Sequence, residues 1–173
     1  MTKSTNLMKK PIFAAGMVLA FGTLAAQGQV VTSSAQNRSL IKTDAVRYLF
    51  PAQVSVAAGM TSPVALHFSI KQGLHINSHT PPLEELIPTA FSIPDGMGVR
   101  LDAATYPPGV AFTLPADPTT KLSVYTGEFV IQARITAQAG NRMVQAKLRY
   151  QACDNNACMP PRTIDVPVNV IAK

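Results

Sequence analysis

Apolar and polar residues alternate along much of the chain beyond residue 50, and this period of two is typical of half-buried β-strands. The clearest run covers residues 64–70. Two more cover residues 129–136 and 144–150, and the small and polar residues 139–141 between them predict a turn, so we expect these two runs to pair as a hairpin. A fourth run covers residues 164–170. Weaker strands are expected at residues 53–56, 89–93 and 99–103.

About seven short strands separated by turn signals predict an all-β fold, an antiparallel β-sandwich of immunoglobulin-like type. An open barrel is the alternative. Only residues 82–86 have a helical pattern, and they supply barely one turn. Two connections, residues 73–88 and 106–120, are rich in proline and longer than strand linkage requires. Because sandwiches carry their functional residues on such loops, these connections are candidate functional segments.

The first 28 residues have a different pattern. An apolar run at residues 12–26 is rich in small side chains and too short for a comfortable membrane span, and lysines precede it at Lys3, Lys9 and Lys10. We interpret residues 1–28 as a secretory signal peptide with cleavage after Gly28, and residues 23–25 as an alternative cleavage motif. An uncleaved N-terminal anchor is the other interpretation of this pattern.

Polar, aperiodic residues 29–44 predict a flexible leader, so the folded domain is expected to span residues 45–173. A composition of 47% hydrophobic and 14% charged residues excludes a disordered chain. Loss of the signal would remove three of the 15 basic residues and half of the formal net charge of +6. The charge therefore gives no argument for nucleic acid, and we expect a protein that is not inserted in the membrane after cleavage and works in an oxidising compartment.

The two cysteines of the chain, Cys153 and Cys158, lie between the strand that ends near Tyr150 and the strand that starts near Arg162. A hairpin connection with a cysteine at each end brings the sulfurs within bonding range, so a disulfide is plausible. Closing so small a ring stabilises a fold by only about 2 kcal/mol, and a ring of about 100 residues would give nearly twice as much. A local, accessible bridge of this kind suits exchange with an external thiolate, although secreted sandwiches also carry structural clips.

Activation of the thiols is not visible in the sequence. No Lys, Arg or His adjoins either cysteine, and Asp154 would raise the pKa of the neighbouring thiol. Residue chemistry alone therefore leaves a redox and a structural bridge equally open.

Residues 150–153 (YQAC) and 158–161 (CMPP) resemble the redox motif of the N-terminal periplasmic domain of DsbD, the thiol:disulfide interchange protein. Weaker similarity is found at residues 73–78, 87–89 and 125–129, so that the resemblance covers roughly residues 50 to 170. It implies an immunoglobulin-like fold. It also implies a domain that receives reducing equivalents from a membrane-embedded partner through a thioredoxin-like domain and passes them to periplasmic disulfide isomerases.

Carried onto this chain, the resemblance makes Cys153 and Cys158 the cycling pair, with Cys158 as the sulfur that joins a partner. Family members shield the pair with an aromatic-bearing cap loop, and Tyr106 is the candidate cap residue here. The acidic cap residues of the best-known members are replaced by Ala104 and Thr105. The membrane and thioredoxin-like domains have no counterpart in the sequence, so we expect a standalone electron carrier with a separate membrane thiol transporter or thioredoxin-like donor.

Two other functions compete with thiol exchange. One is a secreted sandwich without redox activity that binds a protein partner and keeps the disulfide as a clip. The other is copper handling by His75, His79 and Met159, but the sequence guarantees at most two convergent ligands, fewer than a metal site requires. We therefore expect no metal and no other cofactor.

Overall fold

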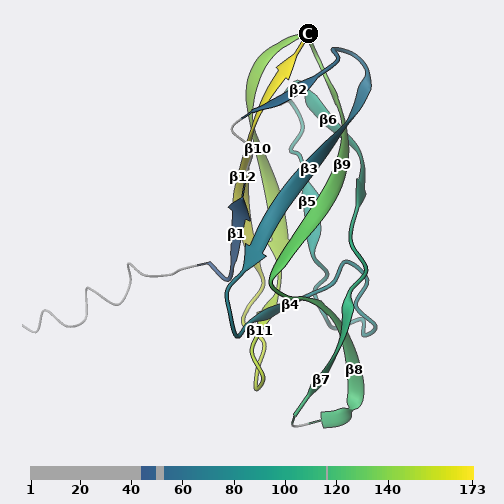
Figure 1. Cartoon of the computed structure of the whole chain (residues 1–173), viewed down its shortest axis with the longest axis vertical. Helices are drawn as coiled ribbons and strands as arrows, with labels where there is room; N and C mark the ends of the chain where they lie inside the picture. Colours follow the sequence, from purple (N-terminus) through teal and green to yellow (C-terminus); the bar gives the residue numbers. More distant parts are fainter. Residues whose placement is uncertain (1–43, 50–52, 116) are drawn as a thin grey trace, which may run out of the picture. The chain divides into compact units, whose positions relative to one another are not determined.

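Strands make up nearly all the regular structure in the computed structural model, which describes residues 44–49, 53–115 and 117–173 (Figure 1). The predicted signal peptide, residues 1–28, and the predicted leader up to residue 43 lie outside the described residues. No helix in the described part of the chain is long and apolar enough to cross a membrane.

Twelve strands occur within the described residues. In chain order they are β1 (Val46–Leu49), β2 (Val54–Val56), β3 (Thr61–Ile70), β4 (His75–Asn77), β5 (Ala90–Ser92), β6 (Val99–Thr105), β7 (Val110–Leu114), β8 (Asp117–Tyr125), β9 (Glu128–Ala137), β10 (Gly140–Tyr150), β11 (Ala152–Cys153) and β12 (Arg162–Ala172).

These strands form three four-stranded sheets. The first has the order β1-β3-β9-β6 and the second the order β2-β12-β10-β5, and the buried faces of these two sheets share one hydrophobic core. The third, smaller sheet has the order β11-β4-β8-β7. All neighbouring strands are antiparallel except the edge pair β2 and β12, which is parallel. The fold is an all-β, immunoglobulin-like sandwich, as the alternating pattern predicts.

The core contains the apolar faces expected from the sequence. Alternate residues of β3, β9, β10 and β12 are buried, because side chains in a strand point to opposite faces in turn. The fully enclosed aliphatic side chains include Leu66, Ile131, Leu148 and Val166. Burial of these side chains supplies the main stabilisation of the sandwich, at roughly 1.5–3 kcal/mol for each large apolar side chain.

The predicted hairpin between residues 129–136 and 144–150 is wrong. β9 pairs with β3 and β6, whereas β10 pairs with β12 and β5, so the chain passes from one sheet to the other between Ala137 and Gly140. Gly140 has φ +124°, which favours glycine at this crossing. Alternation determines which face of a strand is buried but carries no information on the strand with which it pairs, so both arrangements satisfy the same pattern.

The long connections also differ from expectation. Residues 82–86 form a turn, with the Leu86 amide donating to the Leu83 carbonyl over 3.2 Å, and no helix follows. The connection at residues 73–88 contains β4, and the one at 106–120 contains β7 and the start of β8. β4 has only three residues, too few for a period of two to be recognised in the sequence.

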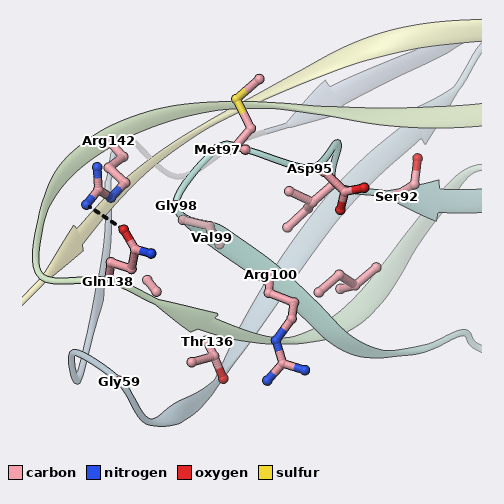
Figure 2. Close-up of a pocket in the computed structure, with 14 residues that line it drawn as sticks. Gly59, Ser92, Asp95, Met97, Gly98, Val99, Arg100, Thr136, Gln138 and Arg142 are labelled. Carbon is pink, nitrogen blue, oxygen red and sulfur yellow. Dashed lines mark hydrogen bonds between the residues drawn. The ribbon is translucent and has the colours of Figure 1, made fainter.

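An open groove of about 780 Å³ lies beside the connection between β5 and β6 (Figure 2). There the Arg142 guanidinium crosses Gly98 and donates to the Ala139 carbonyl over 3.2 Å and to the Gln138 side chain over 3.5 Å. Gly98 has φ +67°, and a Cβ there would lie 2.7 Å from Arg142 Nε, so another residue would be strained and would displace the Arg142 side chain. None of the predicted site residues lines this groove.

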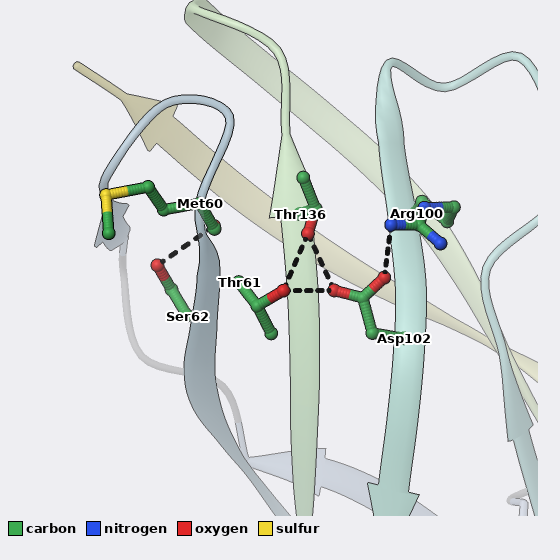
Figure 3. Close-up of polar contacts among 6 residues, drawn as sticks. All are labelled: Met60, Thr61, Ser62, Arg100, Asp102 and Thr136. Atoms are coloured by element: carbon green, nitrogen blue, oxygen red, sulfur yellow. Dashed lines mark hydrogen bonds and ion pairs between the residues drawn. The ribbon is translucent and has the colours of Figure 1, made fainter.

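A polar cluster ties three strands together on the outer face of the first sheet (Figure 3). Asp102 lies at a bulge in β6, and its Oδ2 accepts hydrogen bonds from Thr136 (2.6 Å) and Thr61 (2.9 Å). Arg100 forms an ion pair with its other oxygen at 2.8 Å. The hydrogen bond from Thr136 is the largest cause of the lowered pKa of Asp102. The cluster therefore favours the ionised carboxylate.

Candidate functional site

Both cysteines lie within the segment that joins β10 to β12, and this segment includes β11, the edge strand of the small third sheet (Figure 1). In β11, Cys153 is directly opposite His75 of β4, and on its other side it pairs with Cys158. A disulfide joins the two cysteines, whose Cα atoms are 3.9 Å apart. His75, Cys153 and Cys158 therefore lie side by side across three adjacent chain segments.

The two cysteines differ in their access to solvent. Cys153 is 0% exposed, whereas Cys158 is exposed, as is Met159, whose exposed fraction is 39%. An external thiolate has to approach one sulfur of a disulfide directly, and of the two cysteines it is Cys158 that is open to solvent.

A tight turn built around Asp154 closes the loop between the cysteines. The Asp154 carboxylate accepts hydrogen bonds from the amides of Asn156 (2.7 Å) and Ala157 (2.8 Å), an arrangement that mimics a backbone turn. The Asp154 amide donates to the Ala157 carbonyl over 3.0 Å. These bonds, first that of Asn156 and then that of Ala157, lower the pKa of Asp154, so a negative charge is fixed beside the buried cysteine.

The glutamine of the YQAC segment holds the cysteine loop against the rest of the small sheet. Gln151 Oε1 accepts hydrogen bonds from the Asn77 side chain (3.1 Å) and the Ile87 amide (3.3 Å), and its Nε2 donates to the Met159 carbonyl over 3.3 Å. Asn77 is fully buried and also donates to the Ile87 carbonyl over 3.1 Å. Gln151 thus connects both sides of the disulfide loop to β4 and to the connection after it.

His75 is a site residue that sequence reasoning did not assign to the cysteine pair. Its exposed fraction is 2%, and its ring packs on Phe112 of β7 with centroids 4.2 Å apart. Burial lowers the pKa of His75, and the charge of Asp154 opposes this shift. Its Nε2 atom has no hydrogen-bond partner within the described part of the chain. The only sequence signal was the weak similarity at residues 73–78, because pairing between β4 and β11 joins segments far apart in the chain.

Tyr106, the predicted cap residue, follows β6 and is half-buried. Its ring stacks on His79 with centroids 3.8 Å apart, and its hydroxyl accepts a hydrogen bond from the Phe91 amide over 2.8 Å. His75, the residue opposite Cys153, packs instead on the aromatic ring of Phe112. A capping role for Tyr106 stays a prediction.

The residues considered for copper have other contacts. His79 Nδ1 lies 2.9 Å from the Thr89 carbonyl and its ring covers Tyr106, whereas the His75 ring covers Phe112. Across the described ranges, no group of three or more His, Cys, Asp or Glu side chains comes together in a way that could hold a metal ion.

An aromatic row links the small sheet to the sandwich core. Tyr125 of β8 stacks on Phe129 at 5.0 Å, Phe129 stacks on Phe68 at 5.2 Å, and Phe68 contacts Tyr48 at 5.3 Å. Tyr125 is also opposite Ile76 of β4. The row packs β8, the neighbour of β4 in the small sheet, onto the scaffold.

The family model described as "Thiol:disulfide interchange protein DsbD, N-terminal" matches residues 45–169. The chain belongs to this DsbD N-terminal family. Among solved structures it is similar to the DsbD N-terminal domain of Neisseria meningitidis, crystallised in the reduced form. The two share 16% identity with a TM-score of 0.45, over 65% of this chain and 80% of that one. No curated protein matches the chain in sequence.

Membership of the DsbD N-terminal family confirms the resemblance drawn from the YQAC and CMPP segments. The family and the bonded pair Cys153–Cys158 fit a thiol–disulfide exchange module that acts on protein partners.

Proposed function

We propose that the chain is a periplasmic electron carrier in which Cys153 and Cys158 alternate between a disulfide and a dithiol. The observation that carries the proposal is the unequal exposure of the pair, with Cys153 fully buried and Cys158 open to solvent. An entirely buried bridge would suit a clip, whereas a bridge that presents one sulfur suits exchange with another protein.

Reduction of the module proceeds in two balanced steps. A thiolate of a partner dithiol attacks Cys158 Sγ, the Cys153–Cys158 bond breaks, and Cys153 leaves with the electron pair. The second thiolate of the partner then attacks the partner's own sulfur in the mixed disulfide and releases Cys158. The partner leaves as a disulfide, and the module holds the two electrons as a dithiol. The reverse sequence passes these electrons to an oxidised acceptor.

Membership of the DsbD N-terminal family supports the following choice of partners. The donor is a membrane thiol transporter or a thioredoxin-like protein, and the acceptor is a periplasmic protein of the disulfide isomerase type. The proposed periplasmic location requires export through residues 1–28 as a signal peptide, and an oxidising compartment lets the bridge persist until a donor reduces it.

The midpoint potential tests whether the bridge cycles. We expect oxidised full-length protein in glutathione buffers to equilibrate with a potential above about −300 mV, the range of exchangeable bridges. A potential well below that value would mean that the bridge is structural and would contradict the proposal. The fraction of free thiols can be measured by alkylation and mass spectrometry.

Trapping of mixed disulfides tests which of the two cysteine sulfurs a partner attacks. A Cys153→Ala variant keeps the exposed Cys158 and should accumulate mixed disulfides with its partner in cells, identified by mass spectrometry. The matched Cys158→Ala variant keeps only the buried thiol and should trap far less. Equal trapping by both variants would contradict the assignment of Cys158 as the attacked sulfur. If a Cys153→Ser, Cys158→Ser double variant still captures the same partner noncovalently and loses no electron transfer, the bridge is a clip.

A further inference from the structure

We propose that His75 is the acid–base partner of Cys153, taking the proton of the buried thiol when it attacks the mixed disulfide and returning it when Cys153 is the leaving group. This inference rests on the exchange function proposed above and adds to it the residue that handles the proton.

Strand register places the two groups together. His75 and Cys153 are opposite one another in the antiparallel pair β4–β11, where directly opposite Cβ atoms are about 4.5–5.5 Å apart. Both residues are buried, at 2% and 0% exposure. Cys158 is next in the same row, so the imidazole and the attacked sulfur lie on either side of Cys153.

The imidazole has an unused nitrogen. Buried polar atoms in proteins are almost always hydrogen-bonded, yet His75 Nε2 has no partner among the described residues. The nearby Phe112 ring cannot bond to this nitrogen, because the phenylalanine side chain has no conventional hydrogen-bond donor or acceptor. This nitrogen would gain a hydrogen-bond partner when the bridge opens to a thiol or thiolate, which explains why it has none in the oxidised protein.

The chemistry of Cys153 requires such a group. A thiolate is the nucleophile in exchange, and burial in apolar surroundings disfavours it. The fixed carboxylate of Asp154 follows Cys153 directly and disfavours a second negative charge further. Cys153 is fully buried in the oxidised protein, so a group within the protein is better placed than solvent to take the proton.

The groups around His75 suit both directions of proton transfer. His75 is opposite Cys153 of β11, its ring packs on Phe112 of β7, and the charged residue that acts on it is Asp154. Burial, the largest influence, lowers the pKa of His75, so the resting ring is neutral and has a nitrogen free to accept. Once protonated, the imidazolium is stabilised by the Asp154 carboxylate, which by itself raises the pKa of His75.

The resolving step is balanced as follows. The Cys153 thiol transfers its proton to the neutral imidazole, and the thiolate attacks Cys158 Sγ in the mixed disulfide. The bond between Cys158 and the partner sulfur breaks, the Cys153–Cys158 bond forms, and the partner leaves as a thiolate with the electron pair. In the reverse direction the imidazolium protonates the Cys153 thiolate as it leaves.

A chemical disulfide provides a test that does not need the natural partner. The reduced full-length protein is mixed with 5,5′-dithiobis(2-nitrobenzoate), which first forms a mixed disulfide on the exposed Cys158. Release of the second nitrobenzoate thiolate then reports attack by Cys153. We compare wild type with His75→Phe, which keeps a ring against Phe112 but has no nitrogen, and with His75→Gln, which stays polar but cannot act as a base. The control is His67→Phe, a change at an exposed position of β3.

We expect both His75 variants to slow the second release roughly 10²-fold at pH 7, the usual scale for loss of a general base. The deficit should shrink as pH rises and the thiol ionises without assistance, whereas His67→Phe should follow the wild-type profile. Rate profiles of His75→Phe and His75→Gln that match the wild type would overturn the proposal, as would a deficit independent of pH. If circular dichroism shows that one of the two His75 variants does not fold, the rate profile of the other variant tests the proposal. Failure of the exchange function is recognised separately, by the midpoint potential and the absence of trapped partners.

Discussion

β10 and β12 contain 11 residues each and pair along their whole length, whereas β11 and β4, which hold Cys153 and His75, contain two and three residues. The long strands are stabilised by alternate apolar side chains buried between two sheets. The short strands depend on specific polar contacts, above all those of Gln151 and Asn77.

This difference separates stability from reactivity. The hydrophobic core cluster does not include the cysteine pair, so we expect the scaffold to stay folded when the covalent state of the pair changes. The small sheet contributes Ile76, Tyr125 and Ala152 to the edge of this core and is also packed onto it through the aromatic row that starts at Tyr125. Changes in the two regions should therefore differ in how they affect stability and cysteine reactivity. Four experiments test this separation.

The largest effect is expected in the core. Leu148→Ala removes a fully buried side chain of β10 and should lower the free energy of unfolding by about 2–5 kcal/mol, because a cavity remains. Urea denaturation measures the loss. The midpoint potential of the cysteine pair should stay at the wild-type value, and a large shift in it would show that the core and the site are coupled.

A smaller loss is expected from the polar contacts. Gln151→Leu leaves the Asn77 amide and the Ile87 amide without their acceptor and should cost about 1–3 kcal/mol. Because Gln151 also holds the Met159 carbonyl, the disulfide should react faster with small thiols, as measured by stopped-flow reduction. Thr119→Leu, at the far end of β8, is a control that should leave this rate unchanged. An unchanged rate in Gln151→Leu would show that the loop is held by other contacts.

Reduction of the bridge should cost no more than about 2 kcal/mol, since the closed ring is short. Denaturation of the oxidised protein, the reduced protein and the Cys153→Ser, Cys158→Ser double variant gives the comparison directly. A cost of 4 kcal/mol or more on this scale, typical of a bridge over about 100 residues, would mean that the disulfide supports the sandwich after all.

The smallest effect on stability is expected from Asp102, on the outer face of the first sheet, and it should depend on pH. The pKa of Asp102 is lowered from its usual value of 3.8 in the folded protein, so its carboxylate contributes stability above that value and loses it as the pH falls through the folded pKa. Asp102→Asn should melt slightly lower than wild type at neutral pH, and the difference should disappear in acid. Melting temperatures between pH 7 and pH 2 test this, and a difference that grows in acid would contradict the assignment.

Much of the scaffold was predictable from the sequence, because long strands repeat the same physical rule many times. The inward faces of residues 64–70, 144–150 and 164–170 and the position of the cysteine loop follow from alternation and turn residues. The pairing of β9 with β3 and β6 does not, since the same alternation fits a local hairpin. The site was predictable only as a cysteine pair. His75 was considered only as a copper ligand, because its pairing with Cys153 depends on the register of two very short strands.

In the exchange proposed above, the paired strands on both sides of the cysteine loop would set how long a captured partner stays attached. β10 and β12 remain in register up to Tyr150 and Arg162, and the Met159 amide donates to the Ala152 carbonyl over 2.8 Å. Opening the disulfide therefore does not separate its two ends, and the free thiol of Cys153 stays at a high effective concentration beside Cys158. Mixed disulfides should be short-lived in the wild-type protein, which releases each partner by an intramolecular reaction.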